Sequence, residues 1–463
     1  MNKPREFDQN VLAELEALLG ERVTTSAGIR EHHGKDESYF PFALPDAVVF
    51  PHSTEEVRDI VNICARHRVP MIPYGVGTSL EGHILAVNCG VTIDLSQMNK
   101  VIGVHEEDLD AVVQAGVTRK QLNEFIKHTG LFFPVDPGAD ATLGGMAATR
   151  ASGTNAVRYG TMRENVLSLK VVMADGRIVQ TSRRSKKSAA GYDLTRLFVG
   201  SEGTLGIITE VTVRLYPVQE AMSAAVAAFE TVDGCTKTVI QTIQAGVPIA
   251  RCDIVCEKTV GAINAYRKTN YRVAPTVFFE FHGSAASVVE QAEIVQEIAR
   301  ENGGMDFNWA TRPEDRTQLW DARHNAYFAC LQLRPGSRAV STDVCVPISR
   351  LAECVTETME DVKDYIAPVP LLGHIGDGNF HLMFLVDPAK PEETELAKTF
   401  NKRLVERALR MEGTCTGEHG VGLGKMESMR MELGDEAIGL MRDIKRVFDP
   451  ENLMNPGKVV PPA

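Results

Sequence analysis

The sequence contains no long hydrophobic run. No stretch of the 463 residues reaches the roughly 18 uninterrupted apolar residues that a membrane-spanning helix requires. The first ten residues are charged and polar and have no apolar core, so no secretory signal is expected. From these absences we expect a cytoplasmic protein that is at most peripheral to the inner membrane.

Paired cysteine motifs and an excess of positive charge are also missing. The nine cysteines form no CxxC pair, and their odd number indicates buried thiols. Lys and Arg total 49 against 61 Asp and Glu, which gives a formal net charge of -12. This balance argues against nucleic acid as a partner. An acidic chain that takes an anionic substrate must gather its positive charge locally.

The length exceeds what one hydrophobic core usually organises, which predicts two domains. Helix and strand patterns mix without strict βαβ alternation, which favours an α+β fold. Apolar patterns predict strands at 47–50, 69–74, 91–95, 111–115, 167–173, 207–215, 224–229 and 276–283. They predict helices at 8–22, after the capping box Ser53-x-x-Glu56, and at 235–245, 288–302 and 438–447, and an irregular segment at 23–44.

Three glycine-rich patches lie at 73–83, 137–160 and 200–209. Closely spaced glycines let backbone N–H groups turn toward an anion. The first patch is not a dinucleotide fingerprint, because Leu80 stands where glycine is needed, and not a Walker A loop, because His83 replaces the lysine. One such patch is as well explained by a surface turn, whereas three in one domain indicate a long ligand held at several points.

Histidines and a carboxylate recur in the second half. His374 and His381 flank a Gly-Asp-Gly turn, and Glu418 precedes His419 among glycines. Either motif alone is more often structural, and Asp377 is expected only to shape its turn. Two imidazoles and one carboxylate in one chain favour an open site for a divalent metal.

The order of the glycine patches resembles the FAD-binding domain of the vanillyl-alcohol oxidase superfamily. The resemblance covers about 45–220 and implies noncovalent FAD, with His83 not bonded to it. It implies a two-subdomain FAD-binding (PCMH-type) domain. The residues it places at the cofactor are Pro73, Gly75, Gly77, Thr78, Ser79, Pro137, Gly138, Thr142, Gly144, Gly145, Ser152, Asn155, Tyr159, Glu202, Gly203, Ile207, Ile208 and Asn455.

The histidine motifs resemble the FAD-linked oxidase C-terminal domain of D-lactate, D-2-hydroxyglutarate and glycolate dehydrogenases. By this resemblance His374, His381 and Glu418 bind zinc or manganese. His419 is placed to take the substrate hydroxyl proton, and Arg323 to pair with the substrate carboxylate.

The resemblances also predict the domain layout. We expect a lead-in at 1–44, the FAD-binding domain at 45–219, and a substrate- and metal-binding cap domain at 220–420. The cap is expected to hold an antiparallel sheet flanked by helices. The segment 421–463 is expected to return to the FAD-binding domain.

The implied function is flavin-dependent oxidation of a small D-2-hydroxy acid to the 2-oxo acid, with D-lactate favoured. Ser341 and Met383 stand where the hydroxyglutarate relatives carry polar anchors for a second carboxylate. A D-2-hydroxyglutarate dehydrogenase and the flavin subunit of a multi-subunit glycolate dehydrogenase stay open. So do a metallohydrolase and a non-catalytic flavin-binding module. The expected electron acceptor is a cytochrome, a quinone or an electron-transfer flavoprotein, and a homodimer is allowed.

Overall fold

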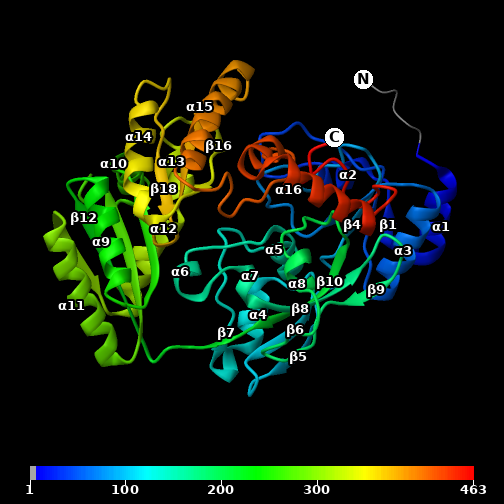
Figure 1. The fold of residues 1–463 in the computed structure, drawn as a ribbon, viewed down its shortest axis with the longest axis horizontal. Helices are drawn as coiled ribbons and strands as arrows, with labels where there is room; N and C mark the ends of the chain where they lie inside the picture. Colours follow the sequence, from blue (N-terminus) through cyan, green and yellow to red (C-terminus); the bar gives the residue numbers. More distant parts are fainter. Residues whose placement is uncertain (1–6, 463) are drawn as a thin grey trace. The chain divides into compact units, whose positions relative to one another are not determined.

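The computed structural model describes residues 7–462, and the chain divides into two compact units. The first unit comprises Met1–Ser152, Thr161–Pro217 and Glu418–Ala463; the second comprises Gly153–Gly160 and Val218–Gly417. The chain therefore leaves the first unit twice, once for eight residues and once for most of its second half (Figure 1).

The first unit begins with a four-stranded sheet in the order β1-β2-β4-β3. Both β2 and β3 run parallel to β4, and the helices α1 and α3 supply apolar side chains to the same core. The Ser53 side chain caps α3 by accepting from Glu56 N, as the capping box predicts. The bounds are β1 Val23–Thr24, β2 Ala47–Val49, β3 Met71–Tyr74, β4 Val91–Asp94, α1 Gln9–Leu19 and α3 Thr54–Arg66.

A second sheet of the first unit has the order β5-β6-β10-β8-β9 and is antiparallel throughout. A turn at Asp175-Gly176 joins β8 to β9. Two helices, α4 and α5, precede β8 and pack on this sheet through Leu122 and Leu143. The bounds are β5 Val101–His105, β6 Asp110–Gln114, β8 Val166–Val172, β9 Ile178–Gln180, β10 Ile207–Arg214, α4 Arg119–Ile126 and α5 Leu143–Thr149.

The C-terminal segment completes the first unit. Its helix α16 (Met426–Phe448) is interrupted at Gly434, where φ is 78°. Beyond the helix, Met454 forms a parallel bridge with Met71 of β3, and Asn455 N donates to Met71 O at 2.8 Å. The last residues therefore add a short strand-like piece beside β3.

The second unit is built on one large antiparallel sheet, in the order β15-β12-β14-β13-β18-β19-β16, with β17 also paired to β19. Leu319 and Trp320 of α12 pack against Phe278 of β14. The bounds are β12 Ala221–Phe229, β13 Ile249–Val255, β14 Thr276–Gly283, β15 Gly304–Ala310, β16 Arg338–Ser341, β17 Val344–Cys345, β18 Leu371–His374 and β19 Asn379–Val386. The helices are α9 Val232–Gln244, α10 Glu257–Arg267, α11 Ala285–Glu301, α12 Pro313–His324, α13 Ala326–Leu331, α14 Leu351–Asp361 and α15 Pro391–Arg410 (Figure 1).

The α+β prediction is confirmed, and the predicted strands and most predicted helices lie within a few residues of those observed. The exception is the helix predicted at 438–447, which covers only the part of α16 after its interruption at Gly434. The irregular segment at 23–44 was predicted wrongly in part, because it contains β1 and α2 (Ala27–His33). Strand β1 is only two residues long and is defined by its pairing with β2. Local sequence carries little information about such a long-range pairing.

Candidate active site

The two histidines of the second unit lie on adjacent strands. His374 ends β18 and His381 lies within β19, joined by a tight turn. Gly378 in this turn has a φ of 81°, and a Cβ there would lie 2.0 Å from Val346 O. The turn therefore requires glycine at this position, and it brings the two ring centroids to 5.8 Å.

Each imidazole is held by an acceptor at Nδ1. His374 Nδ1 lies 2.8 Å from the Asp253 carboxylate, and His381 Nδ1 lies 2.9 Å from Thr342 O. Because both partners accept, Nδ1 carries the proton in each ring, and Nε2 keeps its lone pair. This arrangement is typical of histidines that ligate a metal.

Glu418 brings a carboxylate to the two histidines. Ligand atoms of His374, His381 and Glu418 lie within 4.8 Å of one another. Glu418 lies two positions after Thr416, whose Oγ1 donates to the Asp343 carboxylate at 2.8 Å. The donor set fits a divalent metal ion, because two imidazoles and a carboxylate can bind such an ion and leave coordination positions open.

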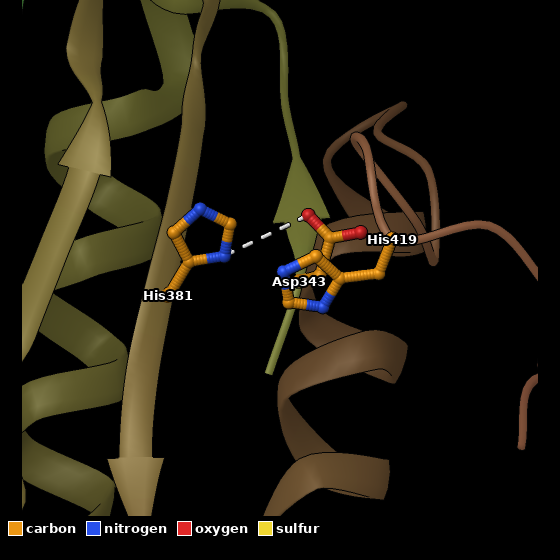
Figure 2. Close-up of side chains that lie close together, drawn as sticks. All are labelled: Asp343, His381 and His419. Atoms are coloured by element: carbon orange, nitrogen blue, oxygen red, sulfur yellow. Dashed lines mark ion pairs between the residues drawn. The ribbon is translucent and has the colours of Figure 1, made fainter. Parts of the chain in front are cut away.

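Asp343 forms a second group with the same histidine. Ligand atoms of Asp343, His381 and His419 also lie within 4.8 Å of one another. Figure 2 shows the Asp343 carboxylate directed toward the His381 ring, and Asp343 Oδ1 lies 3.7 Å from His381 Nδ1. Asn379 Nδ2 donates to the same oxygen at 2.8 Å, so hydrogen bonds orient this buried carboxylate.

Asp253 contacts both the candidate metal ligand His374 and Arg323, the residue predicted to pair with the substrate carboxylate. Arg323 of α12 lies 2.9 Å from Asp253 through Nε, while His374 contacts the other carboxylate oxygen. Burial raises the pKa of Asp253, but the charge of Arg323 and the hydrogen bond from His374 outweigh it and hold the pKa below its ordinary value. Asp253 therefore stays ionised and fixes both neighbours.

Sequence reasoning missed Asp253, Asp343 as a site residue, and the strand β13. On β13, Arg251 and Asp253 alternate with the buried apolar Cys252 and Ile254. Alternation of charged and apolar residues puts both charges on one face of the sheet. That alternation was the signal that could have found them.

In the first unit the glycine patches converge around β3. A Cβ on Gly75 would lie 2.5 Å from Thr142 Oγ1 of the second patch, and one on Gly203 would lie 2.8 Å from Pro73 Cγ. Gly203 also has a φ of 73°, in the region that disfavours side chains. The first patch thus contacts both the second and the third.

Most of the remaining predicted cofactor residues lie in the same unit. Gly77 (φ 71°), Thr78 and Ser79 follow β3, and Ser79 Oγ donates to Asp36 at 3.3 Å. In the second patch, the Thr142 side chain caps α5 by accepting from Gly145 N, and Gly144 lies in the first turn of this helix. Pro137, Gly138 and Ser152 lie in loops on either side of α5. The buried Ile207 and Ile208 begin β10.

Two predicted cofactor residues belong to the second unit instead. Asn155 Oδ1 accepts from Arg251 Nε at 2.8 Å, and Tyr159 Oη lies 3.0 Å from His282 Nδ1. These contacts attach the short segment Gly153–Gly160 to β13 and β14.

Glu202 and His83 form a buried ion pair in the first unit. His83 Nε2 lies 3.2 Å from Glu202, and the backbone N–H groups of Val421 and Gly422 donate to the same carboxylate at 2.7 and 2.8 Å. Burial opposes ionisation of both groups, but their mutual attraction outweighs it: the pKa of His83 is raised and that of Glu202 is lowered. A Cβ on Gly420 would lie 2.7 Å from both side chains, so glycine lets the loop approach them.

Asn455 joins the first and third patches. Its Nδ2 donates to His83 O at 2.9 Å and to Glu202 O at 2.8 Å. The C-terminal turn is therefore attached to the glycine loops through one amide.

Family models account for most of the chain. Residues 45–182 match the model described as FAD binding domain, and residues 218–459 match FAD linked oxidases, C-terminal domain. The probable mitochondrial D-lactate dehydrogenase of Danio rerio is 52% identical over 456 residues, covering 98% of this chain and 92% of the relative. The mitochondrial D-lactate dehydrogenase [cytochrome] of Arabidopsis thaliana is 46% identical and covers 99% of this chain and 81% of the relative.

Solved structures share the fold. The structure of p-cresol methylhydroxylase with substrate bound superimposes with a TM-score of 0.80 at 20% identity, covering 97% of this chain and 96% of that chain. At this identity the likeness shows the fold alone.

The prediction of a cytoplasmic location is wrong. Both the zebrafish and the Arabidopsis relatives are named as mitochondrial. The prediction relied on the lack of an apolar segment, and mitochondrial targeting segments are amphipathic rather than apolar. Within residues 7–462, no helix combines the length and apolar character that crossing a membrane requires.

The extent of these matches confirms the family predicted from the glycine and histidine motifs. Over nearly its full length, this chain belongs to the FAD-linked oxidases.

Proposed function

We propose that this chain is an FAD-dependent D-lactate dehydrogenase that oxidises D-lactate to the 2-oxo acid and passes electrons to a cytochrome. The zebrafish and Arabidopsis relatives carry D-lactate dehydrogenase in their names, and the Arabidopsis name adds the cytochrome. Their similarity extends over 98% and 99% of this chain.

The observation that carries the proposal is the set of His374, His381 and Glu418, with Nδ1 of both histidines already bonded. These three side chains would hold a divalent zinc or manganese ion. Such an ion lowers the pKa of a bound hydroxyl and binds a carboxylate oxygen of the same substrate. A 2-hydroxy acid offers both groups on neighbouring carbons.

Arg323 would hold the substrate carboxylate. Its Nε forms an ion pair with Asp253 at 2.9 Å, and its two terminal nitrogens make no hydrogen bond within residues 7–462. The side chain is only 6% exposed, so these donors need a partner. A guanidinium held at Nε presents its terminal N–H groups in a fixed direction, which suits recognition of a carboxylate.

His419 would take the hydroxyl proton, which requires a neutral imidazole. A cation held by the neighbouring Glu418 disfavours the imidazolium form of His419. FAD supplies the hydride acceptor, and the protein contributes binding and orientation. The residues for FAD are the glycine patches that converge around β3, together with Asn455.

The environment of Met383 supports a small substrate. Met383 is opposite Ser341 in the β16–β19 pair, and its buried side chain belongs to an apolar cluster with Ala326 and Cys330 of α13. A second carboxylate in such surroundings would be desolvated without a partner, at a cost of several kcal/mol. D-lactate and D-2-hydroxybutyrate should therefore be better substrates than D-2-hydroxyglutarate.

The test is an anaerobic screen of flavin bleaching with D- and L-2-hydroxy acids. We expect yellow protein that releases FAD on denaturation and is bleached fastest by D-lactate. A higher kcat/KM for D-2-hydroxyglutarate would overturn the substrate assignment. Colourless protein, or flavin that no 2-hydroxy acid bleaches, would overturn the function.

A further inference from the structure

Two lysines close to the C-terminus, Lys445 (partly buried) and Lys458 (buried), differ in how their ammonium groups are satisfied. Lys445 of α16 donates to Thr204 O at 2.8 Å, to Met454 O at 2.9 Å and to the Asp449 carboxylate. A lysine ammonium has three N–H groups. Lys445 is therefore fully hydrogen-bonded within the protein.

Lys458 is more deeply buried and has fewer partners. The residue is 4% exposed, and its Nζ donates to Asn455 Oδ1 at 2.7 Å. Because Asn455 Nδ2 donates to His83 O and Glu202 O, the amide orientation is fixed with Oδ1 toward the lysine. Over residues 7–462, this amide oxygen is the one recorded acceptor of Lys458, so two N–H groups have none.

The nearby carboxylates do not take up these two donors. Glu202 accepts from the backbone of Val421 and Gly422 and pairs with His83, and Asp36 accepts from Ser38 and Ser79. Neither carboxylate lies within ion-pair distance of Lys458 in the described structure. Burial lowers the pKa of Lys458 to about 7, against the opposing effect of Glu202 and Asp36.

The position of Lys458 shows what can satisfy it. Asn455, its acceptor, is bonded to β3 through Met71 O, and β3 leads into the first glycine patch. Glu202 belongs to the third patch, and Ser79 of the first patch donates to Asp36. The ammonium therefore lies beside the loops that would hold FAD, whose pyrophosphate and flavin pyrimidine edge are both rich in acceptor oxygens.

We propose that Lys458 is a cofactor-contacting residue, whose two remaining N–H groups donate to oxygen acceptors of FAD. The inference rests on FAD binding in the proposed function and adds a side-chain ammonium group to the backbone and hydroxyl donors of the glycine patches. With FAD bound, the ammonium would have the three acceptors that Lys445 finds within the protein.

The test compares Lys458→Met with Lys445→Met as the matched control. FAD affinity is measured by titrating apoprotein with FAD, and the flavin midpoint potential and sulfite adduct formation are measured on the holoenzymes. We expect Lys458→Met either to weaken FAD binding by about 10-fold or more, or to lower the midpoint potential and weaken the sulfite adduct. The first result locates the contact at the pyrophosphate and the second at the pyrimidine edge.

Lys445→Met should lower the melting temperature without either change, because its partners are all protein groups. If Lys458→Met does not fold, Lys458→Leu, which also has no N–H donor and no charge, is measured instead. Wild-type FAD affinity and potential in the folded Lys458 variant would overturn the proposal. Wild-type protein without FAD would instead overturn the proposed function.

Discussion

In the first unit, the glycines of the three patches let neighbouring loops approach closely, since a Cβ on Gly75 would meet the Thr142 side chain and one on Gly203 would meet the Pro73 ring. In the second unit, the two histidines that could bind a metal do so through their side chains, and the Nδ1 atom of each is held by Asp253 or Thr342. A long cofactor can be bound by many weak backbone contacts, whereas a metal ion depends on a few ligands. We therefore expect the two regions to fail differently when altered.

The largest effect is expected from removing a metal ligand. His374→Ala should abolish stoichiometric metal and slow flavin reduction by about 10³-fold or more, because the ion contributes several kcal/mol to transition-state stabilisation. Metal analysis and the FAD absorbance spectrum measure the two regions separately. FAD should stay bound, since the glycine patches lie elsewhere in the sequence.

The control for that variant is His128→Ala, which alters an exposed histidine of the first unit. Metal content and rate should both remain at the wild-type level. Active wild-type enzyme without a stoichiometric divalent ion would contradict the assignment of the ligands.

A smaller effect is expected from altering the residue behind a ligand. Asp253→Asn removes the charge that holds both His374 and Arg323, and should weaken metal affinity by about 10- to 100-fold. The measurement is competition with a chelator. Asp233→Asn, at an exposed position on α9, is the control, and equal metal affinity in the two variants would show that Asp253 has no such role.

Gly75→Ala tests whether the close approach of the glycine patches is needed for FAD binding. The added Cβ would lie 2.5 Å from Thr142 Oγ1, so the first two patches must shift apart. Overpacking of this kind costs about 1–3 kcal/mol, which corresponds to FAD binding weaker by about 10-fold. Metal content should not change. Gly28→Ala, where a Cβ meets no atom within 4 Å, should bind FAD normally; if both variants bind FAD equally, the contact does not matter.

The smallest effect, a change in thermal stability, is expected from the buried His83–Glu202 pair, which contributes through its charges. The lowered pKa of Glu202 stabilises the fold above the ordinary value of 4.5, and this stability is lost as pH falls through the folded-state pKa. The raised pKa of His83 stabilises the fold below 6.5, and this contribution is lost as pH rises through the folded-state pKa.

His83→Gln should therefore lower the melting temperature by a few degrees between about pH 5 and 6, and by less at pH 9. Thermal unfolding of both proteins across this range measures the difference. A difference that is the same at every pH would indicate that the pair contributes packing and no charge.

Much of the fold could be predicted from the sequence, because glycine spacing and apolar alternation are local signals. The histidine motif on β18 and β19 was found for the same reason, since one short turn joins both residues. Asp253 could not be found as their partner, because its position depends on the pairing of β13 with β18. The difference between Lys445 and Lys458 is invisible in the sequence, because both are lysines in polar C-terminal segments, and only tertiary hydrogen bonding separates them.

The pairing of β3 with residues 453–455 has a consequence for biosynthesis. The first glycine patch follows β3, yet Asn455 bonds to His83 across 372 positions of the chain. A ribosome makes the glycine loops long before it makes the residue that joins them. Contacts of such long separation form late in folding. We therefore expect FAD to be loaded only after Asn455 has been made, and chains truncated before Asn455 to stay colourless.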